Sequence, residues 1–421
     1  MQIKHSHPSR RTVLEGLTAT SGAALLGSSM LSNAAWAQSA VDPRVAKIVA
    51  DTISVDMHNH DGQPMFAKTP ADARPDPVGV DLRGQMNKAG LSAICLTYAV
   101  DGFRTPQKGE WYQFHLQCLA HDDRLLAQNG MRRALTAADL KTAHANKMPI
   151  VIQDCEGAQW IEGRLERVEE VYKRGLRHMQ LLHQIPDMVE PLGAVQQYTP
   201  LPGGPAAQAV TGLTAFGAQV IRECNRLGIV VDMAHANEET VMGALKVAQQ
   251  PLVVTHTAFD SEVARSSSMY TGNPGLTARL VGKNYAKAVA DFGGVVGIWH
   301  IFPTLKDYVT GIKQLVDVIG VDHVGIGTDT SVAPAPRAAP PPPPANAPAA
   351  ANAGPAAASG GGRGGGGAAG GTNESWPDET GGFLYALAQE MLAQGFIPNE
   401  ISKIAGGNYV RLFGTVTRSA T

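Results

Sequence analysis

The chain has 421 residues, of which 44% are hydrophobic and 17% are charged, so it is long enough and apolar enough to bury a large core. Its formal net charge is −2, and this balance gives no basic footprint of the kind that binds nucleic acid. Beyond the N-terminal segment no apolar stretch is long enough to cross a bilayer, so we expect no transmembrane segment in the mature chain.

The first 37 residues have the pattern of an export signal. Arg10 and Arg11 precede a mildly apolar stretch at 16–31, and Ala35-Trp36-Ala37 offers the small-x-small pattern of signal-peptidase cleavage. An Arg pair ahead of a weakly apolar region resembles a twin-arginine signal, and an ordinary secretory signal is the alternative. Residues 1–37 are therefore predicted to be a signal peptide, and the mature protein is predicted to be periplasmic or secreted.

Eight runs of β-branched and apolar residues, bounded by Gly, Pro or Asp, are predicted to be strands. They cover 53–58, 93–99, 149–155, 178–182, 228–234, 251–255, 293–299 and 323–328. Helical patterns lie between them at 113–128, 164–174, 214–227, 237–248, 276–291 and 305–318. This alternation predicts an α/β fold with a parallel sheet, and closure into a (β/α)8 TIM barrel over 38–332 is the economical solution. A doubly wound open sheet is the alternative, but no glycine-rich phosphate loop follows the first strand.

The segment 333–372 differs in composition from the rest of the chain. It contains five consecutive Pro at 340–344, Ala/Pro repeats, and a Gly-rich run at 360–367. Such a composition cannot bury a core and predicts a disordered surface loop. The segment follows the eighth strand, where a barrel carries its site, and a tolerated insertion is favoured over a lid. Residues 373–421 are predicted to form two helices that complete the barrel domain.

Five of the predicted strands end on residues that bind metals: His58 and His60 on the first, Glu156 on the third, His235 on the fifth, His256 on the sixth and Asp329 on the eighth. Polar side chains at the carboxyl ends of barrel strands meet on one face. His58 and His60 alternate along an extended strand, so both project to the same side and can bind one divalent ion. Glu156 is then placed to bridge to a second ion, held by His235 and His256. Asp329 is placed to take a proton from the attacking water and pass it to a leaving amine.

Several nearby residues have two interpretations. Asp56 and Asp232 lie two and three residues before ligands, where a carboxylate either orients a ligand or caps backbone groups. His300, at the end of the seventh strand, either lines the pocket or is structural. Cys95 and Cys155 lie in predicted strands, where buried free thiols are favoured, and nothing in the spacing of the four Cys demands a disulfide, which is the alternative.

Motifs along nearly the whole mature chain resemble those of one family. They are Asp56-Met-His58-Asn59, Glu156-Gly157, Leu181-Leu-His183, Gly212-Leu-Thr-x-Phe216-Gly, Arg226-Leu-Gly-x-x-x-Asp232-Met-Ala-His235, His256, His323-Val-Gly-Ile-Gly-Thr-Asp329 and Gly406-Gly-Asn-Tyr-Val-Arg411-Leu-Phe413. The chain resembles the membrane (renal-type) dipeptidase family, peptidase family M19, within the amidohydrolase-like barrels. The resemblance implies a metallo-dipeptidase with two zinc ions (Zn²⁺) bridged by Glu156 and a hydroxide. It also implies that His183 contacts the substrate near the scissile carbonyl.

Three positions depart from the family pattern. The family usually has His-x-Asp on the first strand, whereas this chain has His60 in place of the Asp and is followed by Asp61, which is the alternative ligand. The family's Arg for a substrate carboxylate, about ten residues after the sixth-strand His, is matched only by Arg265 in a changed context. The family's Asp-x-Asp-Gly after the eighth strand reads Asp329-Thr-Ser-Val here. The differences from the family thus lie in the first strand and in the segments around Arg265 and Asp329.

The sequence thus predicts an exported zinc-dependent dipeptidase that cleaves dipeptides or similar small N-acyl amino acids. One alternative keeps the metal site and changes the substrate to a lactone, ester or phosphoester. The other is a non-catalytic barrel that serves as a binding protein, with the Pro/Gly-rich insertion as its contact region. The predicted partner is a small molecule or dipeptide rather than nucleic acid, and a homodimer is left open.

Overall fold

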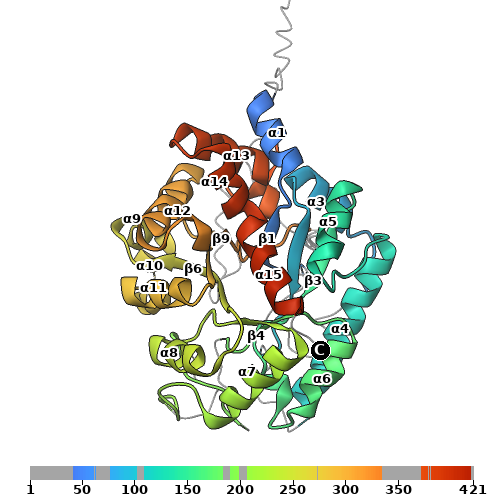
Figure 1. Ribbon diagram of the computed structural model, residues 1–421, viewed down its shortest axis with the longest axis vertical. Helices are drawn as coiled ribbons and strands as arrows, with labels where there is room; N and C mark the ends of the chain where they lie inside the picture. Colours follow the sequence, from blue (N-terminus) through green and yellow to red (C-terminus); the bar gives the residue numbers. More distant parts are fainter. Residues whose placement is uncertain are drawn as a thin grey trace, which may run out of the picture. The chain divides into compact units, whose positions relative to one another are not determined.

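Eight parallel strands form the centre of the fold in the computed structural model, and the helices lie around them (Figure 1). The structure describes residues 41–60, 62, 76–101, 109–183, 190–198, 206–272, 274–333, 371–377, 379 and 381–418. The predicted signal peptide, Asp61 and residues 334–370 of the predicted insertion lie outside these ranges, so the expectations for them stay predictions.

The strands close into a barrel. They are β1 (Val55–His60), β2 (Ala93–Thr97), β3 (Ile150–Gln153), β4 (His178–Gln180), β5 (Val230–Asp232), β6 (Val253–Phe259), β8 (Val295–Ile298) and β9 (Val324–Ile326). Parallel ladders join β1-β2-β3 and β4-β5-β6-β8-β9. A parallel bridge between Gln153 and Leu176 joins the two groups on one side, and one between Asn59 and Thr330 joins them on the other. The predicted (β/α)8 barrel is therefore confirmed.

The helices follow the strands with short extra segments between them. They are α1 (Pro43–Asp51), α3 (Leu82–Ala89), α4 (Glu110–Gln128), α5 (Ala137–Ala145), α6 (Glu166–Lys173), α7 (Ala215–Leu227), α8 (Glu238–Val247), α9 (Glu262–Arg265), α10 (Ser268–Gly272), α11 (Lys283–Asp291), α12 (Leu305–Ile319), α13 (Phe383–Ala393), α14 (Pro398–Ser402) and α15 (Asn408–Arg418). Within the described ranges, none of these helices has both the length and the hydropathy that crossing a membrane requires.

One predicted helix, 276–291, is wrong in its first half. A 3₁₀ turn at Pro274–Arg279 and a short strand, β7 (Leu280–Val281), precede α11, for which Gly282 is the N-cap. β7 pairs in parallel with the end of β6, so backbone hydrogen bonds to β6 replace those of a helical turn. This pairing brings Arg279 to the rim of the barrel.

The C-terminal helix α15 closes the end of the barrel at which the strands begin. Its Tyr409, Leu412, Phe413 and Val416 are buried in one cluster with Val55, Ile150, Val230, Val253 and Val295. Each of these five strand residues is the first of its strand. Figure 1 shows α15, in red, lying across the strands. Because this end is filled by apolar side chains, a polar site is left to the carboxyl ends of the strands.

The two ends of the predicted insertion lie side by side in the fold. Ser331 bridges to Gly371, and the backbone N–H of Thr372 donates to the carbonyl oxygen of Ser331 at 3.0 Å. The hydroxyl oxygens of Thr330 and Thr372 are 2.7 Å apart. Ala333 and Thr372 are both buried, so the outermost residues of segment 333–372 belong to the folded barrel.

Candidate metal centre

Glu156 is surrounded by imidazole rings at the carboxyl ends of the strands. Its Oε1 lies 3.3 Å from Nε2 of His235, 3.5 Å from Nε2 of His256 and 3.7 Å from Nε2 of His58. Its Oε2 lies 3.7 Å from Nε2 of His60. One buried carboxylate thus contacts imidazoles delivered by three different strand ends. Imidazole and carboxylate ligand atoms are thereby brought together, as a metal site requires.

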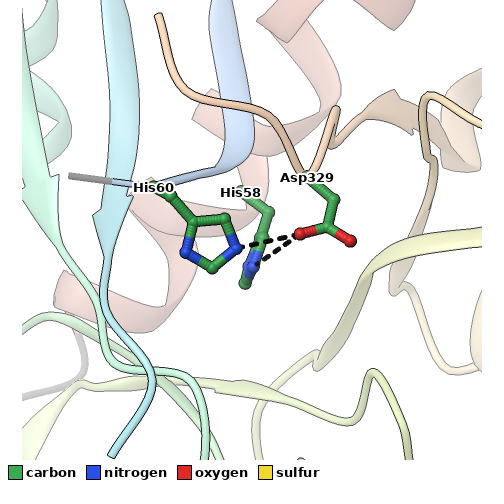
Figure 2. Close-up of side chains that lie close together, drawn as sticks. All are labelled: His58, His60 and Asp329. Atoms are coloured by element: carbon green, nitrogen blue, oxygen red, sulfur yellow. Dashed lines mark hydrogen bonds and ion pairs between the residues drawn. The ribbon is translucent and has the colours of Figure 1, made fainter. Parts of the chain in front are cut away.

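His58 and His60 point from β1 toward Asp329, which follows β9 (Figure 2). The Nε2 atom of His60 is 2.9 Å from Oδ1 of Asp329, and that of His58 is 3.8 Å from the same oxygen. β1 and β9 are held together here because the backbone N–H of Asp329 donates to the carbonyl oxygen of His58 at 3.1 Å. The three side chains offer ligand atoms within 4.8 Å of one another.

Two further groups of side chains share residues with this one. Ligand atoms of His58, Glu156 and His256 lie within 4.8 Å of one another, and so do those of Glu156, His183 and His235. His58 and Glu156 each belong to two of the three groups, so the groups form one continuous cluster of ligand atoms. The structure thus brings together every sequence-predicted site residue except Arg265.

Polar atoms of this cluster are left without hydrogen bonds. Within the described part of the chain, both ring nitrogens of His58, Oε2 of Glu156 and Nδ1 of His235 are buried and have no hydrogen-bond partner. A buried polar atom without a partner costs about 1–3 kcal/mol, so native proteins rarely leave several together. Imidazole nitrogens and a carboxylate are the ligand set that zinc prefers, and these residues therefore fit a bound metal.

Burial sets the protonation of the cluster. It holds the pKa values of His58, His235 and His256 well below the usual range, with the neighbouring imidazoles and Arg279 adding to the effect. These rings are therefore neutral and can present a lone pair to a cation. Burial also raises the pKa of Glu156. A cation beside Glu156 would favour its ionised form and reverse this effect.

Two of the residues adopt a left-handed backbone conformation. His235 has φ 66° and Asp329 has φ 57°. Non-glycine residues in such conformations cost of order 1–3 kcal/mol each and cluster at functional sites. The fold thus stores local strain at two of the strand ends that deliver metal-binding side chains.

Thr255 orients His256 and was missed by sequence reasoning. Its hydroxyl donates to Oδ2 of Asp232 at 2.5 Å, so its oxygen accepts from Nδ1 of His256 at 3.0 Å. This assignment leaves the lone pair of His256 on Nε2, which faces Glu156. Asp232 therefore helps to orient His256 through Thr255. It also accepts from the backbone N–H of Ala234 at 2.9 Å. The position of Thr255 directly before His256 was the available signal.

Asp56 and His300 have structural partners. Asp56 accepts from the backbone N–H and the hydroxyl of Thr328 at 2.9 and 2.6 Å, and thereby ties β1 to β9. His300 Nε2 donates to the carbonyl oxygen of Ser375 at 3.0 Å, and its ring packs on Trp376. The four cysteines are buried free thiols.

The two arginines near β6 have opposite environments. Arg265 is 54% exposed and donates to Asp260 from Nε and Nη2, at 2.5 and 2.7 Å. Arg279 is 3% exposed, lies over the ring of Trp299 and donates from Nη2 to the carbonyl oxygen of His256 at 3.3 Å. Its Nε is buried and has no hydrogen-bond partner within the described ranges. Arg279 is thus the buried cation beside the cluster, and sequence reasoning missed it by placing it inside a helix.

Comparison with known proteins agrees with this barrel fold. Residues 42–337 match the family model described as Membrane dipeptidase (Peptidase family M19). The chain is 28% identical over 225 residues to an uncharacterized dipeptidase of Schizosaccharomyces pombe, and the match covers 49% of this chain and 47%, about half, of that protein.

Solved structures with a similar fold include the following two. The probable dipeptidase PvdM from Pseudomonas aeruginosa has a TM-score of 0.64 at 14% identity, over 89% of this chain and 98% of that one. A metallo peptidase from Rhodobacter sphaeroides, liganded with a phosphinate mimic of the dipeptide L-Ala-D-Ala, has a TM-score of 0.56 at 19% identity, over 87% of this chain and 100% of that one. At these identities the similarity shows the fold.

Proposed function

The chain belongs to the membrane dipeptidase family, peptidase family M19, and from this premise we propose that it hydrolyses the amide bond of dipeptides or similar small N-acyl amino acids with two zinc ions. The observation that carries the proposal is the convergence of five imidazoles on the buried carboxylate of Glu156. Burial lowers the pKa of three of these rings, His58, His235 and His256, so they are neutral and can present lone pairs to a cation beside the carboxylate.

In this proposal His58 and His60 would hold one ion, His235 and His256 would hold the second, and Glu156 would contribute to both. Zinc held in this way would supply a water of lowered pKa and would polarise a substrate carbonyl. Thr255 keeps Nε2 of His256 unprotonated for this purpose.

The other side chains act on protons and on the substrate. The carboxylate of Asp329, which lies beside His60 at 2.9 Å, accepts the proton of the attacking water and returns it to the leaving amine. His183, whose Nε2 lies 3.5 Å from Oε1 of Glu156, contacts the oxygen of the scissile carbonyl. Arg279 binds the carboxylate of the substrate from its buried position beside His256.

A panel of substrates tests the proposed activity. Purified zinc-loaded protein is expected to hydrolyse dipeptides, to lose this activity on treatment with a chelator, and to regain it when zinc is added back. Lactones and phosphoesters of similar size serve as comparators. Chelator-sensitive turnover of the comparators without any turnover of an amide would contradict the dipeptidase proposal.

Arg279→Met is expected to raise KM for dipeptides by about 10- to 100-fold, because a hydrogen bond to a charged group contributes about 1.5–3 kcal/mol. Steady-state kinetics with a dipeptide and with the same dipeptide as its C-terminal amide measure the effect. The wild type should prefer the free carboxylate, and the variant should lose this preference. Arg279→Lys should recover part of it, since the positive charge remains.

Arg265→Met is the matched control, because it removes an arginine that faces solvent from the same connection after β6. Its KM should equal that of the wild type. A raised KM in Arg265→Met together with an unchanged KM in Arg279→Met would show that Arg265, and not Arg279, binds the substrate carboxylate.

We also propose that the protein is exported to the periplasm or beyond by a twin-arginine-type signal, on the basis of Arg10, Arg11 and the cleavage pattern at Ala35–Ala37. Replacing Arg10 and Arg11 together by Lys should leave the uncleaved chain in the cytoplasm, as cell fractionation would detect. Export that is unaffected by this change would instead indicate an ordinary secretory signal.

A further inference from the structure

We propose that Asp101 is a positioning residue that fixes the ring of His183 in the orientation needed to meet a substrate carbonyl. The inference rests on the proposed function, in which His183 contacts the substrate. It adds a carboxylate from the end of β2, a strand that contributes no side chain to the metal cluster itself.

The contact between Asp101 and His183 is short and is shielded from solvent. Nδ1 of His183 lies 2.6 Å from Oδ1 of Asp101, and each residue is only 1% exposed. Asp101 lies four residues beyond the end of β2, and His183 lies three beyond the end of β4. The second carboxylate oxygen, Oδ2, lies 3.5 Å from Nε2 of Gln159, an amide donor on the turn that follows β3. Asp101, which follows β2, is therefore also contacted from the turn after β3, the strand that lies between β2 and β4.

The contact determines which ring atom faces the centre. A carboxylate accepts hydrogen bonds, so the proton in this contact is on Nδ1 of His183. Nε2 is then the ring atom that approaches Oε1 of Glu156 at 3.5 Å, and the ring packs edge-on against that of His235. A flipped ring would lose the bond to Asp101 and turn a carbon toward the substrate. Carboxylates that orient metal-binding imidazoles typically contribute about 10- to 100-fold to affinity or activity, and we expect an effect of this size for Asp101.

The kinetic test compares Asp101→Ala, His183→Ala and the double variant in the zinc-loaded mature chain. Asp101→Ala is expected to lower kcat by about 10- to 100-fold with little change in KM and none in zinc content. If Asp101 acts through His183, the double variant has the kcat of His183→Ala alone. Added formate should restore part of the activity of Asp101→Ala and none of that of His183→Ala.

Asp122→Ala is the matched control. It removes another fully buried carboxylate, which accepts from the amide of Gln153 at 2.7 Å rather than from an imidazole of the cluster in that contact. Its kcat should stay near that of the wild type, even if its melting temperature falls. Equal kcat values for Asp101→Ala and Asp122→Ala, or kcat losses that multiply in the double variant, would overturn the proposal.

Nitrogen-15 NMR of the histidine rings separates this proposal from the proposed function. The wild type should show a proton on Nδ1 of His183 in a strong hydrogen bond, and Asp101→Ala should lose that signal while Asp122→Ala keeps it. If the wild type shows the signal but cleaves no dipeptide, the proposed function fails and the positioning of His183 by Asp101 is still supported. A His183 signal that is the same in Asp101→Ala and the wild type would reject the positioning role whatever the substrate.

Discussion

Glu156→Gln is expected to strip metal from the protein and to lower kcat/KM for dipeptides by at least about 10³-fold, well beyond the 10- to 100-fold loss typical of a residue that only supports a ligand. Glutamine keeps the size of the side chain but lacks the negative charge. Four imidazole nitrogens lie within 3.7 Å of Oε1, and no other carboxylate contacts as many of them within the described residues. Metal analysis after gel filtration and steady-state kinetics measure the two effects.

The same variant should be more stable than the metal-free wild type at neutral pH. Burial raises the pKa of Glu156 above its ordinary value of 4.5, so the folded metal-free protein binds this proton more tightly than the unfolded chain does. The stabilising effect of the proton is present below pH 4.5 and is lost as the pH rises through the raised pKa. Urea unfolding in chelator should therefore show a gap between variant and wild type that widens from acid to neutral pH.

A result in which Glu156→Gln retains two zinc ions, with kcat/KM within about tenfold of the wild type, would contradict the bridging role. Glu162→Gln is a suitable control. Glu162 is also buried but pairs with Arg167 at 2.7 Å rather than with imidazoles. Its change should lower the free energy of unfolding and leave the zinc content unaltered.

Asp329→Asn is expected to lower kcat by about 10²- to 10⁴-fold, the usual contribution of a general acid–base group. Asparagine keeps the shape of the side chain and an oxygen at the position of Oδ1, which lies 2.9 Å from Nε2 of His60. Its Nδ2 carries no lone pair for a proton from water, and the leaving amine then has no proton donor at this position. Steady-state kinetics at saturating zinc measure the loss, with zinc content determined alongside.

The control for this prediction is Asp322→Asn, which changes an exposed carboxylate just before β9 that pairs with Lys403. It should not alter kcat. If Asp329→Asn lost as much zinc as Glu156→Gln, Asp329 would be mainly a ligand. If Asp329→Asn kept the wild-type kcat, another residue would have to carry the proton.

The barrel could be predicted because its strands are short β-branched runs with clear boundaries. All eight predicted strands overlap the observed ones, and Thr214 caps α7 as its side chain suggests. The segment around Arg279 could not be predicted in the same way. Its extended conformation depends on pairing with β6, which is a tertiary contact, whereas its local pattern is helical.

The grouping of the site residues also followed from the barrel, because the carboxyl ends of parallel strands converge. The finer geometry of the site did not follow from the predicted barrel. The left-handed conformation of His235 and the hydrogen bond between Asp101 and His183 depend on packing between strands that are distant in sequence. Arg265 was favoured by its distance from His256 along the chain, and that distance says nothing about which way a side chain turns.

Because Ser331 and Gly371 are paired with each other, the chain between them is a suitable place to insert a domain or to open new termini. Since the two ends are already joined, the length of the segment between them enters the free energy of folding only as a logarithm, at about 0.6 kcal/mol per doubling. New chain termini or a whole reporter domain should therefore be accepted here without loss of the barrel. A reporter domain inserted after Ser331 would be attached two residues from Asp329, and its fluorescence could report on substrate that enters the site.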